Sequence, residues 1–185
     1  MMEMVLIRHG EPDTAACDSR NFAGQGYELA PLTQKGVAQA KEAAHSPLLQ
    51  GAQMILSSPY TRALQTAAEI SRVTGLEIRV EMDLRELEKD LQHRSFSKAQ
   101  LDQQHQEFLL HKGSYPQNQP CCWETVEQLS QRVLPVLEQY TSYKKIIVVT
   151  HGGVIRRFVE KGKIEYAKPY LVQVSSPIKC FGWCE

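Results

Sequence analysis

Two histidines stand where the chain could use an imidazole to handle phosphate. His9 follows the apolar run 4–7, and His151 follows the apolar run 146–149. Each run is short and stops at a polar residue and glycine, a pattern typical of a buried strand that ends in a turn. Ligands of open parallel α/β sheets bind beyond the carboxyl ends of the strands, so both rings could reach one ligand. A neutral imidazole at that place could attack phosphorus or bind a phosphoryl group.

Two arginines are expected close to these histidines. Arg8 directly precedes His9, and Arg62 lies in the first turn of a helix that is predicted to follow the strand 53–56. Ser58 is the predicted N-cap of this helix, with proline next to it at the favoured first helical position. Guanidinium groups, imidazoles and the partial positive charge of helix N-termini would together hold a phosphoryl dianion. The sequence therefore indicates a local cluster of positive groups suited to phosphate.

Short apolar runs alternate with amphipathic segments, and this order predicts how the polar groups are positioned. Strands are expected at 4–7, 53–56, 77–80, 145–149, 170–174 and 179–183. Helices are expected at about 33–44, 58–75, 124–140 and 154–161 and within 88–123, with a long loop at 11–30. This alternation predicts an α/β fold, a three-layer α/β/α sandwich with a mainly parallel central sheet. The final strands are expected to be antiparallel at one edge.

Length and composition limit the kind of protein. A chain of 185 residues with 42% hydrophobic and 23% charged residues is typical of a single globular domain, 1–185. A formal net charge of zero gives no sign of a nucleic-acid partner, and no apolar run is long enough for a membrane partner. The N-terminus lacks the pattern of a signal peptide, so a cytoplasmic protein is expected. The five cysteines lack zinc-ligand spacing, so no metal or other cofactor is expected.

Four motifs together carry a resemblance to a known family. They are Arg-His-Gly-Glu at 8–11, Leu-Thr-x-x-Gly-x-x-Gln-Ala at 32–40, Ser-Ser-Pro-Tyr-Thr-Arg-Ala-Leu-Gln-Thr-Ala at 57–67 and Thr-His-Gly-Gly-Val-Ile-Arg at 150–156. In type and order they resemble the histidine phosphatase superfamily, the phosphoglycerate mutase-like group. The resemblance implies a phosphoglycerate mutase-like fold and a phosphohistidine intermediate on His9. It also implies that Arg8, Arg62 and His151 bind the phosphoryl oxygens and stabilise charge in the transition state.

The resemblance also suggests the remaining site residues. In this family a carboxylic acid protonates the leaving oxygen and then activates water, and the segment 84–87 looks like the one that bears it. Glu86 is therefore the expected catalytic acid, and Glu88, two residues further on, is its alternative. Phe22-Ala23-Gly24 resembles the family's Phe-x-Gly turn near substrate. Backbone N–H groups of Ala23 and Gly24 are therefore expected to bind substrate.

The polar segment 88–123 is where the chain differs most from the family pattern. We expect it to form a partial lid and, together with 13–27, to select the substrate. The favoured function is a metal-independent phosphatase that hydrolyses a small phosphorylated metabolite. Mutase-type phosphoryl transfer, a protein phosphohistidine phosphatase and a non-catalytic phosphate-binding module are the alternatives. The apolar C-terminal strands and Cys180–Cys184 could contribute to a homodimer interface.

Overall fold

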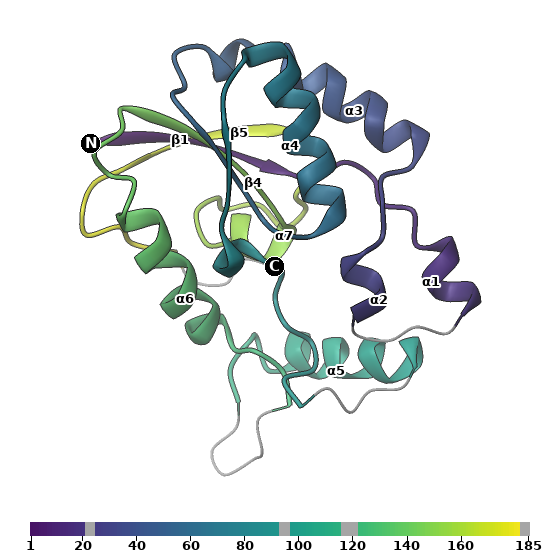
Figure 1. Cartoon of the computed structure of the whole chain (residues 1–185). Helices are drawn as coiled ribbons and strands as arrows, with labels where there is room; N and C mark the ends of the chain where they lie inside the picture. Colours follow the sequence, from purple (N-terminus) through teal and green to yellow (C-terminus); the bar gives the residue numbers. More distant parts are fainter. Residues whose placement is uncertain (21–24, 93–96, 116–121, 182–185) are drawn as a thin grey trace.

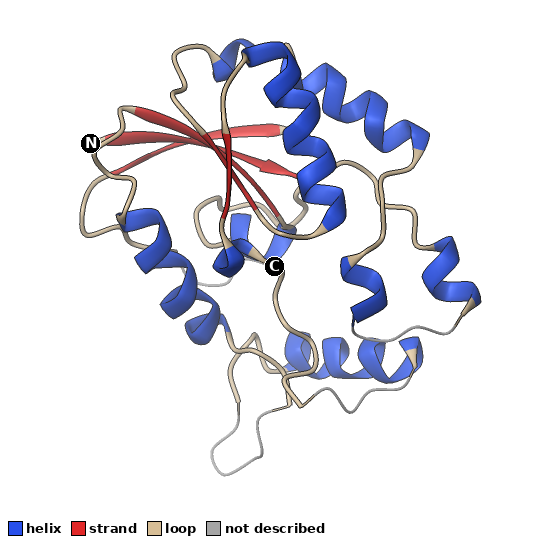
Figure 2. Cartoon of the chain, viewed as in Figure 1, coloured by secondary structure: helices blue, strands red, loops and turns tan. Residues whose placement is uncertain are grey.

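The computed structural model describes residues 1–20, 25–92, 97–115 and 122–181. A five-stranded sheet in the spatial order β3-β2-β4-β1-β5 forms its centre (Figure 1, Figure 2). The strands are β1 (Met2–Arg8), β2 (Ile55–Ser57), β3 (Ile78–Val80), β4 (Lys145–Thr150) and β5 (Pro169–Val174). Strands β1 to β4 run parallel, and β5 pairs antiparallel with β1. The predicted parallel sheet with an antiparallel edge strand is confirmed.

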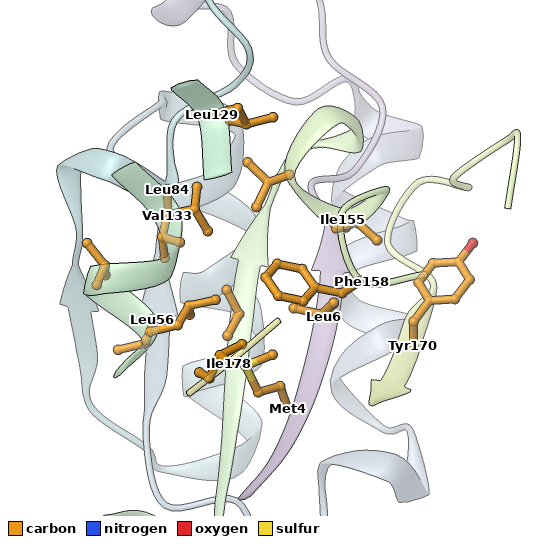
Figure 3. Close-up of a cluster of buried hydrophobic side chains, with 14 of the residues drawn as sticks. Met4, Leu6, Leu56, Leu84, Leu129, Val133, Ile155, Phe158, Tyr170 and Ile178 are labelled. Carbon is orange, nitrogen blue, oxygen red and sulfur yellow. The ribbon is translucent and has the colours of Figure 1, made fainter. Parts of the chain in front are cut away.

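Helices cover both faces of this sheet (Figure 2). They are α1 (Ala15–Ser19), α2 (Gln25–Glu28), α3 (Gln34–Ala44), α4 (Thr61–Thr74), α5 (Lys98–Leu110), α6 (Val126–Glu138) and α7 (Gly152–Ile155), with 3-10 turns η1 (Pro47–Leu49) and η2 (Met82–Leu84). Val5 and Ile7 of β1 pack with α3 and α4, whereas Met4 and Leu6 pack with α6 and α7 (Figure 3). Side chains alternate between the two faces along a strand, so one strand supplies both cores. The predicted three-layer α/β/α arrangement is confirmed.

Strand register brings three chain segments to one edge of the sheet. Arg8, the last residue of β1, is opposite Thr150 at the end of β4. The His9 amide donates to the Thr150 carbonyl at 3.0 Å, and the Ser58 amide donates to the Val149 carbonyl at 2.9 Å. The residues that directly follow β1, β2 and β4 are therefore neighbours, as parallel strands require.

The start of α4 differs from the prediction. The helix begins at Thr61 with Tyr60 as its N-cap, and no side chain caps it. Ser58 lies before the helix, where its hydroxyl is 2.7 Å from His151 Nε2. The Ser-Pro pattern therefore marked a helix start correctly to within a few residues but assigned the serine the wrong partner. By contrast, Thr33 caps α3 as predicted, through a bond from the Gly36 amide.

Three further predictions about elements are wrong. The loop 11–30 contains the short helices α1 and α2, whose few residues are too short to show helical periodicity. The helix expected at 154–161 is α7, which ends at Ile155. Residues 179–181 form no strand, and 182–183 lie outside the described residues. The described C-terminal residues instead bond outside the sheet, with the Ile178 amide donating to Glu138 and the Phe181 amide donating to the Arg157 carbonyl.

The polar segment 88–123 contains a helix, α5, as predicted. Figure 1 shows α5 near α1 and α2, on the side of the molecule away from the sheet. Phe108 of α5 is buried and packs edge-on against Trp123 with ring centroids 5.1 Å apart. Both rings belong to the core on the α6 face of the sheet. This polar segment is therefore attached to the core by the packing of these two aromatic side chains.

Candidate active site

His9 lies directly after β1 and is almost fully buried. Its Nδ1 is 2.7 Å from the Gly10 carbonyl oxygen, and its Nε2 accepts a hydrogen bond from Arg62 Nε at 3.1 Å. A carbonyl oxygen can only accept, so the ring hydrogen is on Nδ1 and the lone pair is on Nε2. His9 therefore presents a nucleophilic nitrogen toward the guanidinium of Arg62.

The backbone beside His9 has no room for a side chain. A Cβ added at Gly10 would lie 2.4 Å from the carbonyl oxygen of Gly36, in the first turn of α3. The Gly10 amide donates to Thr66 Oγ1 of α4 at 3.0 Å. Close approach of β1 to two helices thus requires glycine here and fixes the carbonyl that orients the His9 ring.

Both imidazoles are held in the neutral state. Burial, and after it the charge of Arg62, lower the pKa of His9 to about 3, although the hydrogen bond to the Gly10 carbonyl acts in the opposite direction. The pKa of His151 also lies well below its usual range. Burial is the main cause, and the nearby His9 and Arg62 lower this pKa as well. A neutral ring keeps the lone pair that attack on phosphorus needs.

Arg62 connects the two histidines. Besides the bond to His9, its Nη2 is 3.5 Å from His151 Nδ1, and its Nη1 donates to the Tyr27 carbonyl at 2.7 Å. The His9 and His151 ring centroids are 5.1 Å apart. The structure thus brings together the arginine and both histidines from three separate parts of the sequence.

Arg8 is held by a loop near the end of the chain. Its guanidinium lies over the ring of Tyr166, 4.1 Å from the ring centroid, and its Nη1 donates to the Ile164 carbonyl at 2.8 Å. The Arg8 Nε atom is buried and has no hydrogen-bond partner among the described residues. An unsatisfied buried N–H costs about 1–3 kcal/mol, so an anion placed there would satisfy it.

Glu86 and Glu88 both line the cavity that Arg8, His9 and Arg62 also line. Glu86 Oε1 accepts bonds from the amides of Gly153 at 3.0 Å and Leu87 at 2.9 Å. A Cβ added at Gly153 would lie 2.5 Å from this same oxygen. Glu86 is therefore tied to the start of α7, directly beyond His151. The cavity lining alone leaves Glu88 as its alternative.

The cavity has a volume of about 300 Å³ and two distinct ends. We call the inner end the group formed by Arg8, His9 and Arg62, which line the cavity, together with two buried residues that do not line it: His151, which contacts Arg62, and Ser58, which contacts His151. Opposite them is an outer wall from α2 and α5, formed by Tyr27, Glu28, Lys98, Leu101 and Asp102. The segment 88–123 thus contributes a wall of the cavity through α5. Ala23 and Gly24, the predicted backbone donors, lie outside the described residues.

Two members of the site were not predicted as such. Ser58 bonds to His151 through a contact between residues far apart in sequence, which a local pattern cannot indicate. Tyr166 packs on Arg8, and its ring centroid is 5.6 Å from that of His9. It lies in an irregular segment before β5, where no periodicity or motif could have singled it out.

Comparison with known proteins identifies the family. The family model of the histidine phosphatase superfamily (branch 1) matches residues 4–165. The chain belongs to this superfamily. A relative from Hydrogenobacter thermophilus with the provisional name phosphoserine phosphatase 2 is 29% identical over 86% of this chain and 77% of its own length. GpmB of Escherichia coli, provisionally named a phosphoglycerate mutase, is 30% identical over 82% of this chain and 70% of its own length.

A solved structure shares the fold of this histidine phosphatase superfamily member. The mycobacterial glucosyl-3-phosphoglycerate phosphatase superimposes with a TM-score of 0.65 and is 25% identical, covering 84% of this chain and 76% of that one. The phosphoglycerate mutase-like fold that the motifs implied is thus confirmed, and so is membership of the histidine phosphatase superfamily.

The described residues include neither a metal-binding cluster nor a membrane-spanning helix. No group of three or more His, Cys, Asp or Glu side chains among them is arranged to hold a metal ion. Within those same ranges, no helix has the length and apolarity needed to cross a membrane.

Proposed function

We propose that this protein is a metal-independent phosphatase that hydrolyses the phosphomonoester of a small metabolite through a phosphohistidine on His9 Nε2. The observation that carries the proposal is the orientation of the His9 ring. The Gly10 carbonyl accepts the Nδ1 hydrogen bond, so Nε2 carries the lone pair and accepts a bond from Arg62, and both side chains line the cavity. The low pKa of His9, about 3, supports a neutral nucleophile at physiological pH.

In the first step, Nε2 of His9 attacks phosphorus, a P–N bond forms, and the bond between phosphorus and the ester oxygen breaks. The ring becomes cationic, and the Gly10 carbonyl stabilises it by accepting the Nδ1 hydrogen. Arg8 and Arg62 offset the charge on the three equatorial oxygens. Glu86 donates a proton to the leaving alkoxide, which is otherwise a poor leaving group.

In the second step, Glu86 takes a proton from water, the water oxygen attacks phosphorus, and the P–N bond breaks. Inorganic phosphate leaves, and the His9 lone pair and the proton on Glu86 are restored. The position of Glu86 supports both roles, because its carboxylate lines the cavity beside His9 and its Oε1 is fixed by two amides. No other acid or base enters this cycle, so the same group serves in both directions.

His151 fits the role of a neutral phosphate ligand. The Ser58 hydroxyl oxygen accepts from the Tyr60 amide at 3.3 Å, so its own hydrogen can donate to His151 Nε2 at 2.7 Å. The ring hydrogen is then on Nδ1, which faces Arg62 Nη2 at 3.5 Å. These two N–H donors, 3.5 Å apart, could both donate to one anionic oxygen that lies to the side of the line joining them.

A small substrate is supported by the size of the cavity. Its volume of about 300 Å³ is at the low end of pockets for small molecules. The outer wall mixes tyrosine, leucine, lysine and carboxylates, which suits a polar organic group beside the phosphate. Helix α5 closes one side, so a folded protein surface would fit less easily than a metabolite. Among the relatives, phosphatase names for phosphoserine and glucosyl-3-phosphoglycerate are consistent with this class.

The test is phosphate release from a panel of phosphorylated metabolites in the presence of a chelator. We expect activity that survives chelation, and we expect acid-labile phosphate on the wild-type protein after rapid quenching. His9→Ala should abolish both signals, a loss on the order of 10⁶-fold, as for removal of other catalytic nucleophiles. His45→Ala, a histidine at the end of α3 outside the cavity lining, is the matched control. Full turnover by His9→Ala would disprove the mechanism.

Mutase activity is the second candidate, because GpmB of Escherichia coli matches over much of both chains. A mutase must retain the phosphohistidine until the rearranged substrate returns, whereas a phosphatase admits water. Incubation with 3-phosphoglycerate separates the two by comparing phosphate release with isomer formation. Isomer formation without phosphate release would replace our proposal by the mutase.

A further inference from the structure

Arg132 of α6 divides the five N–H groups of its guanidinium between the carboxylate of Glu124 and the backbone carbonyls of residues 83–86. Its Nε and Nη2 donate to the two oxygens of Glu124, at 2.5 and 2.8 Å. Its Nη1 donates to the carbonyls of Asp83 and of Arg85, the latter at 3.1 Å, and its Nη2 also donates to the Glu86 carbonyl at 3.0 Å. These are five bonds, and a guanidinium has five donors. The pair is well shielded, with 11% and 5% of the Arg132 and Glu124 side chains exposed.

The stretch that Arg132 holds is the one that carries Glu86. Residues 85–88 have neither helical nor strand structure, so no regular ladder of backbone hydrogen bonds fixes their path. Glu124 completes the attachment, because its Oε2 accepts from the Glu88 amide at 3.1 Å and its amide donates to the Glu88 carbonyl at 2.8 Å. The backbone on both sides of Glu86 is therefore fixed by one ion pair.

Neither partner of this ion pair touches the place where phosphate would bind. Arg132 and Glu124 do not line the cavity, whereas Glu86 does. The charge of Arg132 also contributes slightly to lowering the pKa of His151, but the direct contacts of the ion pair with the site are with the backbone on both sides of Glu86. Arginine is suited to this task and lysine is not, because a planar fork can bond a carboxylate and several carbonyls at once.

We propose that Arg132, locked in place by Glu124, is a positioning residue that holds Glu86 within proton-transfer distance of the leaving oxygen. This inference rests on the proposed role of Glu86 as the acid and base of the phosphatase. Proton transfer depends steeply on geometry, so a shift of the Glu86 backbone would slow only the steps that need its proton. Binding of the phosphoryl group at the inner end would be unaffected.

Leaving-group dependence is the measurement that separates positioning from general structural support. Benzyl phosphate releases an alkoxide that needs a proton, and 2,4-dinitrophenyl phosphate releases a phenolate that does not. The first-turnover release of each alcohol is followed with enzyme in excess, so hydrolysis of the phosphohistidine does not limit the signal. The variants are Arg132→Met, Arg132→Lys and Glu124→Gln. Arg72→Met, which breaks an exposed ion pair with Glu69 on α4, is the control.

We expect Arg132→Met to slow benzyl alcohol release by about 10- to 100-fold, within the range of general acid catalysis, and dinitrophenol release by less than about threefold. Arg132→Lys and Glu124→Gln should show the same selectivity with smaller losses, and Arg72→Met should show none. In a Glu86→Gln background, Arg132→Met should add less than about twofold, because both changes remove the same proton transfer. Equal losses on both substrates in all three variants would overturn the proposal and leave only a structural role.

Failure of the Glu86 assignment and failure of the positioning inference give different results. If Glu86→Gln itself shows no leaving-group dependence, Glu86 is not the acid, and the proposed function loses that assignment. If Glu86→Gln shows the dependence but none of the Arg132 and Glu124 variants does, the positioning inference alone is wrong. If circular dichroism shows that Arg132→Met is unfolded, Arg132→Lys and Glu124→Gln decide by the same ratio of rates.

Discussion

The inner end of the cavity and its outer wall are held in different ways. His9 and His151 at the inner end are 3% and 0% exposed, and strand ends, buried hydroxyls and backbone groups fix them. At the outer wall, Lys98 is an exposed residue whose ammonium is 3.6 Å from the carboxylate of Asp18 in α1. Exposed ion pairs of this kind contribute little to the stability of the fold, and salt screens them. The inner end is thus pre-organised for phosphate. The outer wall is held less firmly, and its side chains can change without disturbing phosphate binding, so it is the part suited to selecting the rest of the substrate.

The largest expected difference within the site is between its two carboxylates. Glu86→Gln should slow hydrolysis of alkyl phosphates by about 10²–10⁴-fold, since general acid catalysis is lost. Glu88→Gln, on the same cavity wall, should cost less than about tenfold. Steady-state phosphate release with benzyl phosphate measures both. The reverse order of losses would transfer the acid role to Glu88.

The next largest effect should separate the inner end from the outer wall. Arg62→Met removes one charged donor to the transition state and should lower kcat by about 10²–10³-fold. It should also weaken inhibition by inorganic phosphate, a ligand small enough to occupy the inner end alone. If phosphate inhibited Arg62→Met as strongly as it inhibits the wild type, Arg62 would not bind the phosphoryl oxygens.

Predictability from sequence follows the same division of the molecule. The inner end could be predicted because parallel strands must share an edge, so motifs at 8–11 and 150–156 had to meet. The outer wall could not, because α1 and α2 are too short to show a period and their placement depends on contacts with α5. Ser58 is the exception within the inner end. A Ser-Pro pair predicts a helix cap locally, yet a buried imidazole far along the chain takes the hydroxyl.

Acid should destabilise the inner end through its buried histidines. The unfolded chain protonates His9 below about pH 6.5, whereas the folded protein does so only near pH 3. The unfolded state therefore binds more protons between these values, and the free energy of unfolding falls as pH falls through this window. From pH 7 to pH 5 the His9 contribution lost is about 2 kcal/mol.

Urea unfolding at pH 7 and pH 5 measures this loss. His9→Gln keeps a polar side chain without a titratable ring, so its stability should fall by about 2 kcal/mol less than that of the wild type over the same interval. His45→Gln, at the end of α3, should behave as the wild type does. Equal losses in all three proteins would mean that burial does not keep His9 neutral.

A smaller effect on activity is expected from substitution of Tyr166, whose ring packs against the guanidinium of Arg8. The guanidinium lies 4.1 Å from the ring centroid, and cation–π contacts of this kind contribute about 0.5–2 kcal/mol. Tyr166→Leu should therefore lower kcat/KM by about 2- to 30-fold. Tyr166→Phe keeps the ring and should restore most of the activity. If Phe and Leu lose equally, the hydroxyl rather than the ring face is what Arg8 depends on.

The smallest effect on the chemistry, and the clearest on selection, is expected at Lys98. The Lys98 side chain lines the cavity and forms an exposed ion pair with Asp18. Asp18 also accepts a hydrogen bond from the Tyr27 hydroxyl at 2.5 Å. Lys98→Met should leave inhibition by inorganic phosphate unchanged, because that ligand reaches only the inner end. It should instead change the ranking of kcat/KM among phosphorylated metabolites, by up to about tenfold and less so in high salt. If phosphate inhibition weakens as much as it does in Arg62→Met, Lys98 belongs functionally to the inner end. The two regions would then share the task of binding the phosphoryl group.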